Sequence, residues 1–147
     1  MKNRVALIAA AALMIGASAA CSSGDSSAKR EPGTLPPGGA QLTIDGKDVP
    51  TTAVSCAPAE EYLTTITTGN DTSGATVMVS NAGKLTVEFV RIRNLNGYTL
   101  DYNRGLAGGD ATAALTETTY QFSGSGYGYG PDSPEPTTAP FTLKVAC

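Results

Sequence analysis

The stretch LTVEFVRIRNLNGYTLDY, residues 85–102, decides the fold class of this chain. Asn96-Gly97 separates two runs of β-branched and aromatic residues, and both central positions of a type I′ turn need the positive φ that Asn and Gly tolerate. After the turn, Tyr98, Leu100 and Tyr102 share one face, because side chains in a strand alternate with a period of two. The stretch therefore predicts a β-hairpin.

The first half of this hairpin contains a break in the alternation. Leu85, Val87 and Phe89 share one face, whereas Val90 and Ile92 fall on the opposite phase. A regular strand cannot shift phase by one residue, so either a β-bulge inserts an extra residue or the strand is covered on both sides. We predict a bulge near Phe89-Val90.

Short alternating runs continue on both sides of the hairpin. Gln41–Ile44 precedes an Asp45-Gly46 turn, Ala75–Val79 forms another run, and Phe141–Cys147 ends the chain with four residues on one face. Helical periodicity is almost absent, and Thr and Gly are abundant. The pattern indicates an all-β domain over residues 41–147, a single antiparallel β-sandwich or partly open barrel-like domain behind a flexible N-terminal linker.

Residues 1–20 have the features of a secretory leader. A basic start precedes the apolar run Val5–Ile15, which is too short to span a bilayer, and small residues lead up to Cys21. Small residues followed by Cys and Ser-Ser-Gly resemble a bacterial lipobox, in which the Cys sulfur receives a diacylglycerol and the new amino group is acylated after cleavage. We expect a lipoprotein signal peptide and a lipidated Cys21. The alternative is an ordinary signal peptide with a coincidental cysteine.

The segment after Cys21, up to residue 40, has the composition of a disordered linker. It consists of Ser, Gly, Pro and charged residues, with Leu35 as its one large apolar residue. Beyond residue 20 the chain has eight basic and thirteen acidic residues, and the basic ones are scattered. This distribution argues against nucleic acid as a partner and against electrostatic attachment to anionic lipid. Membrane association therefore depends on the acyl chains, which place the domain on the outer (extracytoplasmic) face of the cell membrane.

With Cys21 lipidated, Cys56 and Cys147 remain. An even number of cysteines in an exported protein predicts a disulfide, and both residues fall on the inward phase of their runs. The alternatives are two free thiols or a metal pair. The metal pair fits less well because the chain has no His, and two sulfurs alone make a poor zinc site.

No catalytic set can be assembled from the sequence. The absence of His removes the commonest general base. We interpret Glu60-Glu61 and the pair Asp45 and Asp48 as solvated loop charges, and Gly69–Gly74 as a turn without the ordered spacing of a calcium loop. We expect no enzymatic activity, no metal, and no cofactor beyond the covalent diacylglycerol and N-acyl chain on Cys21.

Tyr127 and Tyr129 are the candidates for ligand contact. They alternate with glycines in Gly124–Pro140, whose Gly, Pro and Tyr content predicts a long irregular segment. Exposed tyrosine rings suit contacts that are partly apolar and partly hydrated, so they could stack on a sugar or an apolar ligand. The alternative is that both rings pack over the barrel mouth as a lid.

Four short stretches, together with the lipobox-like leader and the Ser-rich spacer, carry a family likeness. They are Ile44–Asp48, the Val-x-Cys of Val54–Cys56, Asn94–Tyr102, and the terminal Phe-x-x-x-Val-x-Cys of Phe141–Cys147. In this order the chain resembles the mycobacterial 19 kDa lipoprotein antigen family, often called LpqH-type.

The resemblance implies an acylated Cys21, a cell-envelope location and a Cys56–Cys147 bridge. Members of that family are surface antigens whose lipidated end is sensed by host innate receptors, and no catalytic residues are known for them. The function expected from the resemblance is a lipid-anchored surface lipoprotein with a recognition or structural role, with a host receptor or an envelope glycolipid as partner. The alternative is a carrier or binder of a lipid or glycolipid in a pocket of the β domain.

Overall fold

The computed structural model describes residues 29–147, so the expected leader and Cys21 lie outside the described range. Ten strands make up this part of the chain, and none of its segments is a helix long and apolar enough to cross a bilayer. The strands are β1 (Ala40–Ile44), β2 (Lys47–Val49), β3 (Val54–Glu60), β4 (Leu63–Gly69), β5 (Gly74–Ser80), β6 (Thr86–Leu95), β7 (Tyr98–Asn103), β8 (Asp110–Thr116), β9 (Thr119–Tyr129) and β10 (Thr137–Ala146).

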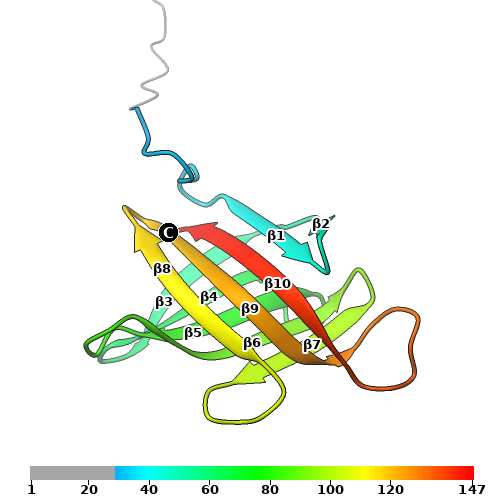
Figure 1. Ribbon diagram of the computed structural model, residues 1–147. Helices are drawn as coiled ribbons and strands as arrows, with labels where there is room; N and C mark the ends of the chain where they lie inside the picture. The colour runs from blue at the N-terminus through cyan, green and yellow to red at the C-terminus, as the bar shows by residue number, and fades with distance from the viewer. Residues whose placement is uncertain (1–28) are drawn as a thin grey trace, which may run out of the picture.

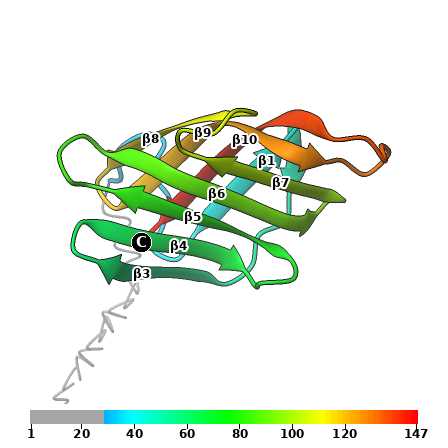
Figure 2. The same ribbon diagram turned by 90° about the horizontal axis from the view of Figure 1, so that it is seen from below.

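All ten strands belong to one antiparallel sheet that curls on itself. Hydrogen-bonded neighbours follow the order β2-β1-β10-β9-β7-β6-β5-β4-β3, and β8 pairs with β9 beside this path. Figure 1 shows β1, β8, β9 and β10 in front of β3 to β6, and Figure 2 shows these two groups of strands one above the other. The expected fold class, an all-β antiparallel domain of partly open barrel-like form, is confirmed.

Both predicted two-residue turns are present. Asn96 and Gly97 have φ of 48° and 79°, and Asp45 and Gly46 have φ of 52° and 73°. Positive φ at both central positions is the signature of a type I′ turn, whose twist matches that of the flanking strands. The Asn96-Gly97 turn contacts β2, since the Asn96 side-chain amide donates to the backbone oxygen of Asp48 at 3.3 Å.

The predicted bulge is confirmed one residue before its expected position. Met78 of β5 pairs with Phe89 of β6, but the next residue, Val79, pairs with Val87. Glu88 is therefore the extra residue, and it lets Val87 and Val90 both point into the core, where each is at most 2% exposed. Without the bulge, the second half of β6 would turn its apolar residues toward solvent.

The hydrophobic core lies between the two groups of strands. Its side chains come from the inward positions of nearly every strand, as a period of two requires. The largest fully buried ones are Phe122, Leu42, Ile44, Ile66, Ile92, Leu100, Leu143, Val77, Val79, Val87, Val90 and Val145.

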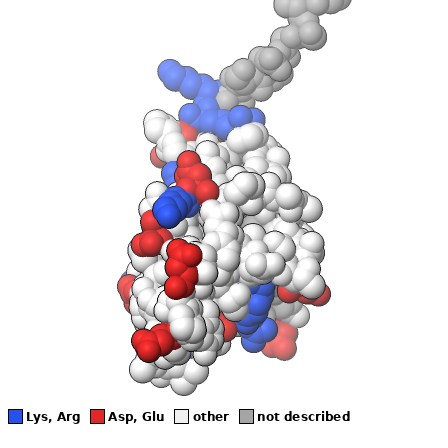
Figure 3. Space-filling model, turned by 90° about the vertical axis from the view of Figure 1, so that its right-hand side faces the viewer, with Lys and Arg blue, Asp and Glu red and all other residues white. Residues whose placement is uncertain are grey.

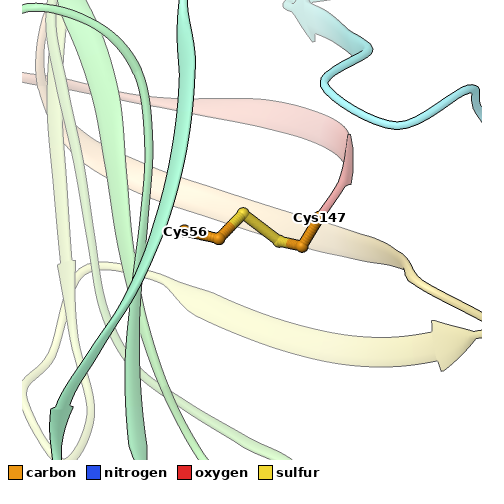
Figure 4. Close-up of a disulfide and its surroundings, with 2 residues drawn as sticks. All are labelled: Cys56 and Cys147. Atoms are coloured by element: carbon orange, nitrogen blue, oxygen red, sulfur yellow. A yellow bond between two sulfur atoms is a disulfide. The ribbon is translucent and has the colours of Figure 1, made fainter.

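A disulfide joins Cys56 to Cys147 across the open side of the curled sheet (Figure 4). Cys56 lies on β3, one edge of the sheet, whereas Cys147 directly follows β10, and their Cα atoms are 5.9 Å apart. Cys56 is half-buried against the core, but Cys147 is exposed, so the expectation of an inward Cys147 is wrong. The alternation of β10 ends at Ala146, one residue before the cysteine, and Cys147 lies beyond the covered part of the sheet.

The end of the expected linker packs against the domain. The Leu35 N–H donates to Thr119 Oγ1 at 3.0 Å, and Gly38 and Gly39 exchange backbone hydrogen bonds of 2.9 Å with Ala146. Contacts with the domain therefore begin before the expected boundary at residue 41. The composition of this segment could not reveal them, because backbone groups make most of these bonds.

Candidate functional site

Tyr127 and Tyr129 lie in β9, so the expectation of a long irregular segment over residues 124–140 is wrong for most of its length. β9 continues to Tyr129 and β10 begins at Thr137, which leaves only residues 130–136 between the strands. Both rings point to the outer side of the sheet and are about half exposed, at 49% and 51%. They are therefore not packed over the interior as a lid.

Two glycines explain why this stretch forms a strand. A Cβ atom at Gly128 would overlap the backbone oxygen of Thr99, and one at Gly126 would lie 2.9 Å from the Cβ of Leu100. Glycine at these inward positions therefore allows β9 and β7 to approach closely. The backbone that carries the tyrosines is held on both sides, by β7 and by β10.

Polar side chains continue the outer face next to the tyrosines. In register across the sheet, Tyr127 of β9 lies opposite Asp101 of β7, and Asp101 lies opposite Arg91 of β6. Asp101 Oδ1 accepts a hydrogen bond of 2.8 Å from Arg93 Nη2, and both side chains are more than a third exposed. An ion pair this exposed contributes little to stability, but it fixes the direction of both side chains.

Arg91 borders a hollow on the same side of the sheet. Its guanidinium carbon lies 4.5 Å from the centroid of the Phe89 ring, a cation–π contact. The hollow has a volume of about 320 Å³ and is lined by Asn70, Asp71, Gly74, Thr76, Arg91 and Arg93. Sequence reasoning missed these arginines. Their signal was the alternation of Phe89, Arg91 and Arg93 on one phase of β6.

Asp45 and Asp48 have structural contacts. The Tyr98 hydroxyl donates to Asp45 Oδ2 at 3.1 Å. Desolvation raises the pKa of Tyr98 above its ordinary value, and the hydrogen bond to Asp45 and the charges of Asp45 and Asp132 raise it further. Both aspartates are exposed loop or edge residues, in agreement with their interpretation as solvated charges.

The segment Gly69–Gly74 is a turn stabilised by its own side chain. Asn70 Oδ1 accepts hydrogen bonds from the backbone N–H groups of Thr72 and Ser73 at 3.0 and 2.9 Å. This pattern is that of an Asx turn, which uses the carboxamide oxygen internally. Across residues 29–147, no three acidic or sulfur side chains gather closely enough to hold a metal ion.

A hollow of about 570 Å³ opens beside β1, β2 and β10. Its lining combines Gln41, Thr43, Thr142 and Lys144, which alternate along β1 and β10 with buried residues, with the core residues Leu42 and Val49. A lipid carried inside the sheet would need the space that the buried core side chains occupy. On the face drawn in Figure 3, charged side chains of both signs gather along the left side and at the lower right, and the area between them is uncharged.

A protein-family model described as Mycobacterium 19 kDa lipoprotein antigen matches residues 33–147. A protein of Mycobacterium avium subsp. hominissuis named "Putative lipoprotein" is 37% identical over 149 residues, which cover 100% of this chain and 97% of that protein. Lipoprotein LpqH of Mycobacterium avium is 31% identical over 111 residues, covering 74% of this chain and 68% of LpqH. LpqH of Mycobacterium tuberculosis H37Rv is 30% identical over 111 residues, covering 74% and 69% of the two chains.

Proposed function

Because this chain belongs to the Mycobacterium 19 kDa lipoprotein antigen family, we propose that acyl chains on Cys21 hold it at the outer face of the cell membrane, where its β domain serves recognition. Its relatives are mycobacterial lipoproteins and lipoprotein antigens. The lipobox-like residues before Cys21 direct cleavage, and the sulfur and new amino group of Cys21 supply the attachment points for two or three acyl chains. One chain alone anchors only marginally, whereas two or more anchor firmly.

The observation that carries this proposal is that the tethered N-terminal segment and the exposed tyrosines lie at opposite ends of the domain. The described chain enters beside the C-terminus, where Gly38 and Gly39 bond to Ala146 (Figure 1). Tyr127 and Tyr129 lie at the other end of the β9–β10 ladder, which runs from the Ala146–Thr119 pair to the Thr137–Gly128 pair. At about 3.3 Å per residue, the two ends are roughly 30 Å apart. A domain tethered through residue 35 therefore presents its exposed tyrosines away from the membrane.

We further propose that the acylated N-terminus is a ligand for host innate receptors and that the protein acts without catalysis. Both proposals extend what the family implies, since its members are named as antigens. The absence of His from the whole chain is consistent with a role outside catalysis.

The test of the anchor is detergent-phase partition of Cys21→Ala expressed in a mycobacterial host. We expect the wild-type protein in the detergent phase and Cys21→Ala in the aqueous phase or the medium. Ser26→Ala is the matched control, because it changes the same N-terminal segment and leaves every cysteine in place, and it should stay in the detergent phase. Cys21→Ala that remains in the detergent phase, or a wild-type N-terminal peptide without acyl mass, contradicts the proposal.

A further inference from the structure

The outer side of β9, β7 and β6 brings together aromatic and charged side chains from three separate stretches of sequence. Register places Tyr127, Asp101 and Arg91 in one row, with Tyr129 opposite Thr99 in the next. Arg93 contacts this group through Asp101. We define the tyrosine–arginine face as Arg91, Arg93, Thr99, Asp101, Tyr127 and Tyr129.

The dimensions of this face require an extended ligand. Neighbouring strands lie about 4.8 Å apart, so Arg91 lies roughly 10 Å from Tyr127 across two strand spacings. The two tyrosines, two residues apart on one strand, are separated by about 7 Å. A ligand that contacts both tyrosines and Arg91 is therefore longer than a single small ring.

The side chains define the chemistry of that ligand. Half-exposed tyrosine rings offer an apolar surface with a hydroxyl at its edge, which suits the alternating C–H and O–H groups of a sugar. Arg93 is already paired with Asp101, but among residues 29–147 no carboxylate forms an ion pair with Arg91. The planar guanidinium of Arg91 matches a carboxylate or phosphate and borders the 320 Å³ hollow that can hold one.

Other classes of ligand fit less well. A single-stranded nucleic acid carries a phosphate at every nucleotide and is bound in a positively charged groove, whereas here one unpaired arginine lies beside Asp71 and Asp101. A protein partner needs about 800 Å² with an apolar, fully desolvated centre. The centre of this face is instead formed by Thr99 and Asp101.

We propose that the tyrosine–arginine face binds a glycan that carries carboxylate or phosphate groups along its length. Sugar rings stack on Tyr127 and Tyr129, and one acidic group pairs with Arg91 in the hollow. This inference rests on the recognition role proposed above and names the class of ligand for it.

The test is calorimetric titration of the purified lipoprotein, with its own N-terminus, in neutral detergent micelles. The probes are hexasaccharides of galacturonic acid and of hyaluronan, with maltohexaose as the neutral probe and inorganic phosphate as the bare anion. We expect an acidic hexasaccharide to bind more tightly than maltohexaose and than phosphate. In saturation-transfer NMR, irradiation of tyrosine ring protons should then reach sugar protons.

Substitutions separate the two kinds of contact. Tyr127→Ala and Tyr129→Ala should each weaken binding of the acidic hexasaccharide about threefold to tenfold. Arg91→Gln should lower the affinity for the acidic hexasaccharide to that for maltohexaose. Tyr62→Ala is the matched control, since Tyr62 is 56% exposed at the β3–β4 turn, far along the sheet from β9. It should leave binding unchanged.

Three results overturn the inference. The first is that neither acidic hexasaccharide binds. The second is that Tyr62→Ala and Tyr127→Ala change the affinity equally. The third is an adventitious ion only, in which inorganic phosphate binds as tightly as the sugars. None of these results changes the partition of Cys21→Ala, and loss of anchoring does not change these affinities. Failure of the inference is therefore distinguishable from failure of the anchor.

Discussion

Removal of the Cys56–Cys147 bridge should lower the free energy of unfolding by about 4.6 kcal/mol at 25 °C, the chain-entropy value for a closed loop of this length. The two cysteines are 91 residues apart in sequence, so the bridge restricts most of the denatured domain. In the folded state Cys147 is exposed and Cys56 only half-buried, so serine at both positions costs little packing. The effect on the denatured chain therefore dominates.

The assay is equilibrium unfolding in urea of a chain that starts at Ser22, compared with the same chain carrying Cys56→Ser and Cys147→Ser. With an m-value of about 2 kcal/mol per molar urea, the midpoint should fall by roughly 2 M. The m-value itself should rise, because an unlinked denatured chain exposes more surface. Wild-type protein in reductant is the control and should match the double variant.

A loss below about 1.5 kcal/mol with an unchanged m-value would refute this reasoning. It would mean that the denatured chain already holds the ends of the domain together without the bridge. Altered amide chemical shifts far from the bridge in the folded double variant would refute it in another way. They would show that the bridge determines the native sheet rather than the denatured ensemble.

Two further predictions concern the far end of the domain. Gly128→Ala should destabilise the protein by roughly 1 to 3 kcal/mol in urea unfolding, because the new methyl group forces β9 and β7 apart. Gly130→Ala, whose Cβ would meet side chains alone, the ring edge of Tyr98 at 3.2 Å and Thr137 at 3.8 Å, should cost less, and equal losses would contradict the close-approach argument. The raised pKa of Tyr98 means that its contribution to stability is complete below pH 10 and is lost as the pH rises above that value. Tyrosinate absorbance should show one late-titrating group that Asp45→Ala moves toward the ordinary pKa, and a titration curve unchanged by Asp45→Ala would contradict this assignment.

Local rules were sufficient to predict the hairpin and its bulge. Asn96-Gly97 carries its turn conformation in its own residue types, and the phase shift around Glu88 follows from a period of two within one strand. The segment Gly124–Tyr129 was misread because glycine is ordinarily a signal for a loop. The need for glycine at position 128 comes from Thr99 on another strand, and no local rule contains that contact.

The candidate site was predicted in part for the same reason. Tyr127 and Tyr129 were identified because alternation with glycine is visible along the chain. Their neighbours Asp101 and Arg91 were not, since only the order β9-β7-β6 brings them into one row. The predicted hairpin gives the pairing of β6 with β7 but not that of β7 with β9, because β8 lies between these two strands in sequence.

The disulfide and the tether meet at one end of the domain, and this arrangement bears on how the other end can be used. Gly38 and Gly39 bond to Ala146, and the next residue, Cys147, is linked to the opposite edge of the sheet. A force applied to the N-terminal segment is therefore transmitted through the β1–β10 hydrogen bonds to Cys147, which is covalently bonded to β3. The far end has no such link, and its shape depends on the turn at Asp45-Gly46, the hairpin tip at Gly97 and the loop that follows β9. Since a Cβ at Gly97 would meet Pro131 at 2.6 Å, this loop and the hairpin tip pack closely. The end of β9 that carries the tyrosines is therefore held between β7 and a packed loop without a covalent bond.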